Sequence, residues 1–180
     1  MTRRHARLLA GLPALALLFA ATRGSAQTKS DGKRGRLPAA VLKAVDDNRP
    51  GAEIGKLEIE DEGGIKLYDI EFKAGRGEIE VAEDGTVLDV VTIVDLKDVP
   101  EAAAAVMRKA AGQGAIRQVE KSEVRARVEK TGGKGRLSVL PASEYVYEAE
   151  LTKGGEIEVA PDGRIIKAPK SMGKGAPVEK

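Results

Sequence analysis

Two short segments of the chain match motifs of serine-dependent acyl transfer. Ser171–Lys174 has the form S-x-x-K and Lys130–Gly132 has the form K-T-G, and penicillin-binding enzymes use such motifs around a nucleophilic serine. The order of the two motifs is reversed relative to those enzymes, and no S-D-N motif occurs. Ser171 also lies in a segment rich in proline and glycine instead of at the start of a helix. We therefore interpret both matches as coincidental.

Two pairs of glutamates have the residue types that glycoside hydrolysis needs for its acid and base. Glu78 and Glu80 form one pair, and Glu156 and Glu158 form the other. Each pair alternates with isoleucine and valine, which is the period of a strand with one buried and one solvated face. Both pairs are therefore predicted to be outward-facing strand side chains and not a catalytic site.

Composition limits the remaining site chemistry. The chain has no cysteine, and its single histidine is His5, so a Ser-His or Cys-His pair and a zinc site with nitrogen or sulfur ligands are not expected. The acidic segments Glu60–Glu62 and Glu83–Gly85 lack the spacing of an EF-hand and are interpreted as turns. Gly133–Gly135 lacks the third glycine of a dinucleotide fingerprint. We expect no catalytic residue, no cofactor and no metal, and hence no enzyme.

The segment from Met1 to Ala26 is typical of a secretory signal peptide. It combines a basic start, an apolar run too short to span a bilayer comfortably and small residues at the end; these are Arg3, Arg4 and Arg7, the run Leu8–Ala21 and the segment Gly24–Ala26. Cleavage is predicted between Ala26 and Gln27. An uncleaved anchor is the alternative, and the Arg3-Arg4 pair is a poor match to a twin-arginine signal.

Removing the signal peptide changes the charge of the protein. Four of the 30 basic residues and none of the 28 acidic ones lie in residues 1–26, which leaves a net charge of −2. Since aromatic residues make up only 3% of the chain, nucleic-acid binding is not indicated. We expect a protein of the periplasm or medium that does not associate with the membrane after cleavage and binds an unidentified protein partner there.

A short stretch occurs twice and indicates how the chain is built. Gly77–Gly85 returns as Gly155–Gly163 with proline in place of one glutamate. Tyr68–Phe72 precedes the first copy and Tyr147–Leu151 the second, both with a strand-like alternation of apolar and charged residues. The Asp-Gly pair in each copy is a hairpin signal. A repeated strand–turn–strand unit is predicted.

A helix is predicted before each set of strands. One begins at Leu37-Pro38 and ends before the Pro50-Gly51 break, and the other is predicted to be capped by Asp98 and to run through Ala111. The sequence thus predicts an α+β fold of two repeats, each a helix packed on an antiparallel β-meander. The predicted divisions are a signal peptide (1–26), a flexible linker (27–36), repeat 1 (37–97), repeat 2 (98–168) and a disordered tail (169–180).

The second copy is longer than the first. Pro38 in the first copy corresponds to Pro100 in the second, and Gly77 corresponds to Gly155. The segment from Pro100 to Gly155 is longer than the segment from Pro38 to Gly77. Repeat 2 is therefore predicted to contain an insertion near 130–144. Because long loops carry function more often than conserved scaffolds, the candidate partner-binding residues are Tyr145, Leu137 and Leu140. A longer hairpin with no role in recognition is the alternative.

The order of these features resembles the PepSY-like domains of secreted bacterial proteins, a β-lactamase-inhibitor-like group. The resemblance rests on the apolar-Pro helix start, the Pro-Gly break, the Tyr-x-x-Glu-apolar strand, the Glu-Ile-Glu-Val strand and the Asp-Gly turn, and it covers about residues 37–168. It implies two tandem copies of a helix on an antiparallel sheet. It also implies a non-enzymatic protein that binds, and inhibits or regulates, a secreted or envelope protein such as a peptidase. The alternative is a passive structural or ligand-sensing module.

Overall fold

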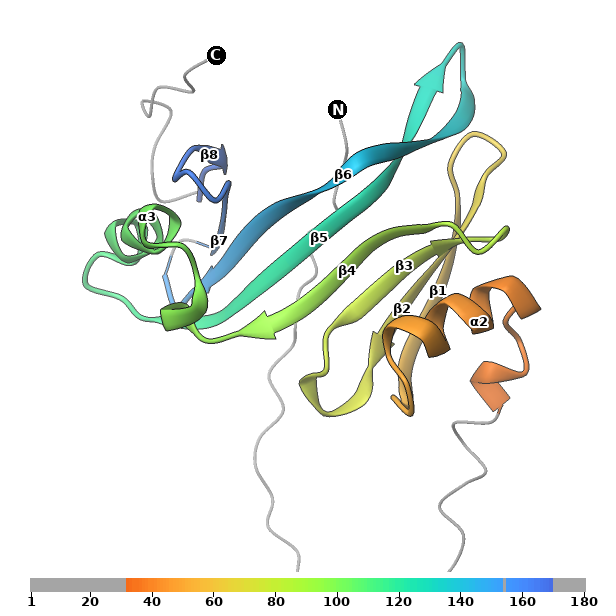
Figure 1. The fold of residues 1–180 in the computed structure, drawn as a ribbon. Coiled ribbons are helices and arrows are strands. Elements are labelled where there is room, and N and C mark those ends of the chain that lie inside the picture. The colour runs from red at the N-terminus through yellow and green to blue at the C-terminus, as the bar shows by residue number, and fades with distance from the viewer. Residues whose placement is uncertain (1–31, 154, 170–180) are drawn as a thin grey trace, which may run out of the picture.

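The computed structural model describes residues 32–153 and 155–169, and its strands form one antiparallel sheet. The strands follow one another across the sheet in chain order (Figure 1). They are β1 (Ile54–Asp61), β2 (Lys66–Phe72), β3 (Glu78–Ala82), β4 (Val87–Val94), β5 (Ile116–Thr131), β6 (Lys134–Leu151), β7 (Gly155–Val159) and β8 (Ile165–Lys167). The chain also contains the α-helices α2 (Ala39–Asn48) and α3 (Glu101–Ala111) and the 3-10 turns η1 (Lys73–Gly75) and η2 (Leu96–Asp98).

The ends of the helices follow from proline and glycine. Pro38 and Pro100 directly precede α2 and α3, where their missing N–H groups leave no hydrogen bond unmade. Gly51 and Gly112 follow the helices with positive φ angles of 68° and 54°, which suit glycine because it lacks a Cβ. Asp98 does not cap α3 as predicted; it closes η2, and the helix begins at Glu101.

Both helices pack on the same face of the sheet. Cross-strand partners share a face, and the registers Ile70↔Ile79↔Val90 and Val119↔Ala149↔Ile157 place these apolar residues under the helices. The buried cluster under α2 contains Val41, Val45, Ile54, Tyr68, Ile70, Phe72, Ile79, Val81 and Val90. The cluster under α3 contains Val99, Ala103, Ala104, Met107, Val119, Tyr147, Ala149, Leu151, Ile157 and Val159.

The predicted α+β fold of two repeats, each a helix on its own meander, is wrong. β4 pairs with β5 from Asp89↔Val124 to Val94↔Val119, so all eight strands belong to a single sheet. The reason lies in β4, whose residues from Leu88 to Val91 are all buried. A strand buried on both faces cannot serve as a solvent-exposed edge with unpaired N–H and C=O groups, and β5 fills that position.

The far end of the β5–β6 hairpin bends over the face opposite the helices. A third buried cluster forms there from Leu67, Ala82, Leu88 and Ala126, with Ile65, Val128 and Leu137 packed against it. At the hairpin tip, which lies beside the β1–β2 turn in Figure 1, Gly135 N–H donates to Gly63 O at 2.8 Å. An added Cβ on Gly135 would lie 2.2 Å from Glu62 O, so this contact requires glycine.

The two copies of the repeated sequence form the same turn. Thr86 N–H donates to Asp84 Oδ1 at 2.8 Å, and Arg164 N–H donates to Asp162 Oδ1 at 3.0 Å. Each aspartate thus closes its hairpin as an Asx turn does. In the part of the chain that the structure describes, no helix is long and apolar enough to cross a membrane. The predicted signal peptide, with its cleavage site at Ala26 and Gln27, lies outside the described residues.

Candidate interaction surface

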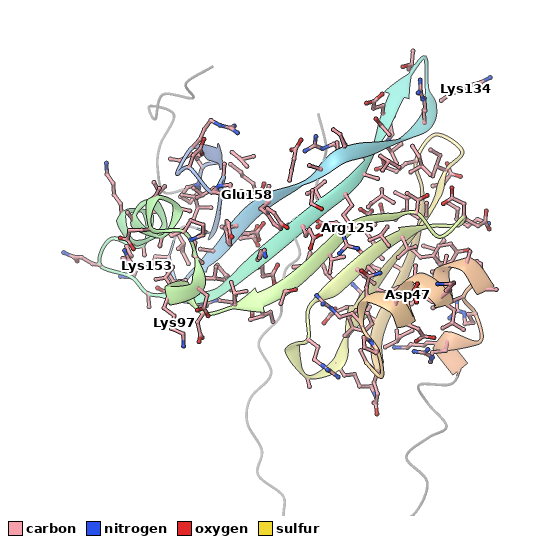
Figure 2. All side chains as sticks on the ribbon, viewed as in Figure 1. Asp47, Lys97, Arg125, Lys134, Lys153 and Glu158 are labelled. Atoms are coloured by element: carbon pink, nitrogen blue, oxygen red, sulfur yellow. The ribbon has the colours of Figure 1, made fainter. Side chains whose placement is uncertain are left out.

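A band of polar residues crosses the helix-bearing face between the two apolar clusters. We call it the central strip: Arg49, Arg76, Thr92, Lys121, Glu123, Arg125, Ser143 and Tyr145. The registers Thr92↔Lys121 and Glu123↔Tyr145 place its strand residues on the face that carries α2 and α3. Figure 2 shows Arg125 near the middle of the sheet, between α2 and the end that carries α3. The sheet therefore holds these side chains in a fixed order from α2 to β6.

Tyr145 is the exposed aromatic residue of the central strip. Its relative exposure is 39%, and Lys121 Nζ lies 4.5 Å from the centroid of its ring. This distance is within the range of a cation–π contact, which orients the ring while leaving part of it open to solvent. Tyr145 is the one predicted recognition residue that the structure places on this surface.

The other two predicted recognition residues lie elsewhere. Leu137 is opposite Val128 in the hairpin and packs on the third cluster, on the face away from the helices. Leu140 is half-buried in a segment of β6 that has no partner in the register, between Val139 and Glu144. The structure does not bring Leu137 together with Tyr145. Val139 is exposed by 69%, and sequence reasoning missed it because alternation alone does not locate a bulge.

Hydrogen bonds fix the polar groups around Tyr145. Arg125 Nε donates to Glu123 Oε1 at 2.8 Å, and Arg125 Nη1 donates to Asn48 Oδ1 at 2.7 Å. Ser143 Oγ donates to the same Glu123 oxygen at 3.0 Å. The hydrogen bond from Arg125 holds the pKa of Glu123 below its usual value. This glutamate is therefore an anion that is already engaged and poorly suited to act as a base.

Arg49 joins the C-terminal end of α2 to β4. Its Nη2 donates to Val91 O at 3.0 Å and to Thr92 Oγ1 at 2.6 Å. Its Nε is buried and has no hydrogen-bond partner among the described residues. Burial lowers the pKa of Arg49, and the charges of Arg125 and Arg76 lower it further. The guanidinium groups of the central strip are thus close enough to repel one another.

The face opposite the helices carries rows of carboxylates. Glu58, Asp69, Glu80 and Asp89 are successive partners across β1–β4. Glu120, Glu148 and Glu158 are successive partners across β5–β7. Lys167 on β8 ends the second row, and its Nζ lies 3.2 Å from both Glu156 Oε2 and Glu158 Oε1. Negative charge therefore gathers on this face, and positive charge gathers in the central strip.

Glu148 is a partly buried carboxylate with other carboxylates on both sides. Glu120 flanks it from β5, Glu156 and Glu158 face it from β7, and Lys167 on β8 is the cation nearby. Burial and the surrounding carboxylates raise the pKa of Glu148 to about 7. Glu158, predicted to be solvated, is buried with 7% exposure. Solvent reaches this row less than strand alternation suggests.

Replacing Glu148 with glutamine is expected to remove a pH dependence of stability. The folded-state pKa is raised from 4.5 to about 7, so the folded state binds a proton more tightly, and stability falls as pH rises between these values. After allowance for solvent screening, Glu148→Gln should be more stable than the unchanged protein by about 2 kcal/mol at pH 8 and equal to it near pH 4. Urea unfolding across this range measures the difference.

A glutamate of the same strand and face provides the control for this experiment. Glu150 follows Glu148 on the same face of β6 and pairs with Arg117 at 2.9 Å. Glu150→Gln should show no gain in stability at pH 8, because it removes the ion-pair partner of Arg117. Identical pH profiles for Glu148→Gln and the unchanged protein would show that Glu148 titrates normally.

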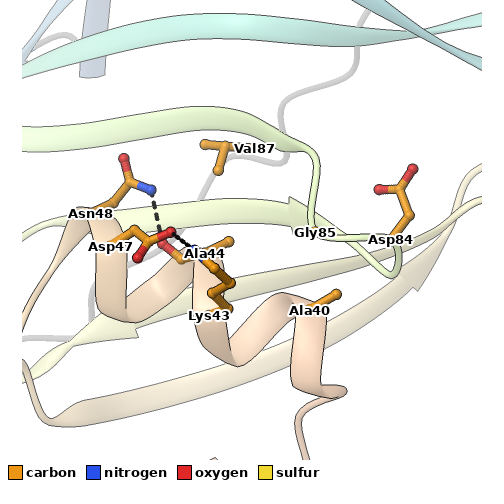
Figure 3. A pocket seen from close by; sticks show the side chains of 8 residues that line it. All are labelled: Ala40, Lys43, Ala44, Asp47, Asn48, Asp84, Gly85 and Val87. Atoms are coloured by element: carbon orange, nitrogen blue, oxygen red, sulfur yellow. Dashed lines mark hydrogen bonds and ion pairs between the residues drawn. The ribbon is translucent and has the colours of Figure 1, made fainter.

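A pocket lies between α2 and the β3–β4 turn (Figure 3). It is lined by Ala40, Lys43, Ala44, Asp47, Asn48, Asp84, Gly85 and Val87. Lys43 Nζ pairs with Asp47 Oδ2 at 2.6 Å, and Asn48 Nδ2 donates to Ala44 O at 2.8 Å. Asp84 accepts the turn hydrogen bond. The polar groups of this pocket thus have partners within the fold.

The acidic residues of the described chain do not form a metal-binding cluster. In residues 32–153 and 155–169, no group of three or more histidine, cysteine or acidic residues is arranged to hold a metal ion. In the two acidic segments, Asp61 Oδ1 accepts a hydrogen bond from Gly64 N–H at 2.8 Å, and Asp84 does the same for Thr86. These aspartates act as turn residues. Ser171 of the S-x-x-K match lies outside the described residues.

The chain is similar in structure to several solved proteins, at low sequence identity. No family model matches the chain, and no curated protein matches it. A crystal structure of a candidate periplasmic protein from Bacteroides eggerthii matches with a TM-score of 0.50 and 14% identity, covering 73% of this chain and 86% of that one. A DUF2874 family protein from Bacteroides uniformis matches with a TM-score of 0.47 and 15% identity, covering 72% and 86% of the two chains.

A third match is a BLIP-like protein from Bacteroides fragilis. Its TM-score is 0.42 and its identity 17%, and the match covers 76% of this chain and 89% of that one. The likeness to the Bacteroides eggerthii protein shows a shared fold over most of the chain. The single sheet described above corrects the prediction of two tandem PepSY-like copies.

Proposed function

We propose that the chain is an exported, non-enzymatic protein that binds another protein of the periplasm or medium and restrains it by steric contact. A secreted peptidase is one partner of this kind. The observation that carries the proposal is the exposed ring of Tyr145, which Lys121 holds at the β6 end of the central strip. Export is supported by the predicted signal peptide and by the description of the Bacteroides eggerthii protein as a candidate periplasmic protein.

The residue types of the central strip fit protein recognition. Binding energy at protein interfaces concentrates in tryptophan, tyrosine and arginine side chains, and the strip combines Tyr145 with Arg125 and Arg49. Arg125 is held by two hydrogen bonds, and Tyr145 is held by the cation–π contact. Side chains that are already ordered lose less entropy when a partner binds. The central strip would therefore lose little side-chain entropy when a partner binds.

A binding role also agrees with the chemistry that the chain carries. There is no cysteine, and the single histidine lies in the predicted signal peptide. The carboxylate nearest to Tyr145 along the register is Glu123, and it accepts hydrogen bonds from Arg125 and Ser143. A general base needs a lone pair that is free to take a proton. The central strip is thus suited to contact and not to proton transfer.

Tyr145→Ala is expected to weaken partner binding by about 2 kcal/mol or more, which is the loss typical of an interface anchor. Photo-crosslinking from a reactive amino acid placed at position 145 would first identify the partner in an envelope extract. Calorimetry with that purified partner would then compare the unchanged protein with Tyr145→Ala. Because Tyr145 is 39% exposed, the free energy of unfolding should change by less than about 1 kcal/mol.

Ile166 provides a control with similar exposure. It is 44% exposed and lies on β8, far from the central strip along the sheet order. Ile166→Ala should bind the partner as the unchanged protein does. If the two substitutions weaken binding equally, or if crosslinks form at position 166 and not at 145, the proposed surface is wrong.

A further inference from the structure

We propose that the guanidinium groups of Arg49, Arg76 and Arg125 together bind a small oxyanion group, either a carboxylate or a phosphate. We call these three residues the arginine site. The inference goes beyond the proposed function, because a small anion can occupy the arginine site with no protein partner present. It concerns one end of the central strip, where α2 ends against β4 and β5.

Three separate elements bring these arginines together. Arg49 follows α2 and donates to Val91 O and Thr92 Oγ1. Arg76 precedes Gly77, whose backbone lies against the same two residues: a Cβ built on Gly77 would be 2.0 Å from Val91 O and 3.2 Å from Thr92 Cα. The third arginine, on β5, reaches Asn48, the residue before Arg49. All three side chains therefore begin from points around the same part of β4.

The arginine site has donors that the fold does not use. Arg49 Nε is buried without a hydrogen-bond acceptor among the described residues. Arg76 is exposed and forms no hydrogen bond or ion pair with the described part of the chain. A buried donor without an acceptor costs free energy. An oxygen ligand beside Arg49 would remove that cost.

The excess of positive charge in the central strip also favours a bound anion. Arg49, Arg76, Arg125 and Lys121 face a single carboxylate on the strip, Glu123. That carboxylate already accepts hydrogen bonds from Arg125 and Ser143. Burial lowers the pKa of Arg49, and the charges of Arg125 and Arg76 lower it further, as expected for cations that lie close together. A bound anion would offset this repulsion.

The chemistry of the guanidinium group selects the class of ligand. Its planar fork matches two oxygens of one carboxylate or phosphate, whereas a lysine presents only a point charge. The arginine site contains three guanidinium groups near the middle of the sheet, of which Arg125 already donates to Glu123 and Asn48 through two of its nitrogens. A spherical anion such as chloride cannot accept two parallel hydrogen bonds in this way, so an oxyanion should bind more tightly than chloride at equal ionic strength.

The test is a titration of the purified protein with inorganic pyrophosphate and, separately, with citrate at constant ionic strength. The arginine Nε–H signals in nitrogen-15 NMR spectra report binding at the arginine site. We expect a saturable shift of the Arg49 signal with at least one of the two anions, and the tighter of them identifies the group as phosphate or carboxylate. Sodium chloride over the same range should give no saturable shift.

Matched arginine substitutions complete the test. Arg76→Ala should weaken anion binding about tenfold, the loss of one charge-assisted contact, without changing the fold because the side chain is exposed. Arg136 is also exposed but lies on the β5–β6 hairpin, and Arg136→Ala should bind as the unchanged protein does. Absence of a saturable shift, or equal binding by Arg76→Ala and Arg136→Ala, would overturn the inference. Either result would leave Tyr145-dependent partner binding untouched.

Discussion

Replacing Gly77 with alanine is expected to lower the free energy of unfolding by about 3 kcal/mol or more. Two costs combine at this position. The φ angle is +79°, a conformation that alanine adopts only with strain, and the added Cβ would lie 2.0 Å from Val91 O. The backbone of β4 cannot move aside without loss of its pairing with β3 and β5. Chemical denaturation of Gly77→Ala and the unchanged protein measures the difference.

The second copy of the repeated sequence supplies the control. Gly155 corresponds to Gly77 and has a φ angle of +88°, but nothing lies within 4 Å of an added Cβ. Gly155→Ala therefore carries the conformational strain alone and should cost about 1 kcal/mol. Equal losses at the two positions would mean that β4 yields to the new methyl group and that the close approach is unimportant for stability.

Ile79→Ala and Ile157→Ala are each expected to lower the free energy of unfolding by about 3 kcal/mol. Both side chains have 0% exposure and occupy the centres of the clusters under α2 and α3. Since β4 and β5 join both clusters into one sheet, each substitution should shift a single cooperative transition. Thermal unfolding followed by circular dichroism and by calorimetry tests whether the transition is single.

Ile166 is the control for these two substitutions, because it is also an isoleucine but is 44% exposed. Ile166→Ala should change the free energy of unfolding by less than about 0.5 kcal/mol. Two resolved transitions, with Ile79→Ala moving one and Ile157→Ala moving the other, would show that the two ends of the sheet unfold independently.

Strands such as β2 were predictable because their apolar residues alternate. Tyr68, Ile70 and Phe72 share one face of β2, as their spacing predicted, and all three are buried. The start of α2 after Pro38 and the end of α3 at Ala111 agree with the prediction, whereas the predicted cap of α3 at Asp98 was wrong because the helix begins at Glu101. The joining of β4 to β5 was not predicted, because period-2 alternation shows which side chains share a face but not which strand will cover an edge. The predicted two-repeat fold was wrong for this reason.

The candidate surface was only partly predictable. Tyr145 was selected because it has no counterpart in the first copy, and the structure places it on the helix-bearing face; its recognition role stays a prediction. Arg49 and Arg125 were missed, since they lie far apart in the sequence and meet only through the order of the strands. The only local sequence feature that could have indicated this surface is the position of Arg49 directly before the Pro50-Gly51 break. Leu137 was predicted for its position in the insertion, and it packs against the third cluster, on the face away from the helices.

The chain-order sheet leaves two outer strands, β1 and β8, and neither invites further strand pairing. β8 has three residues, and β1 has a register shift between Ile54 and Lys56. Short edges, bulges and charged edge residues are the devices by which natural sheets avoid aggregation. Additional strands from other molecules are thus discouraged at both margins. The proposed binding of a partner would then use side chains on the broad faces of the sheet and not the addition of a strand at either edge.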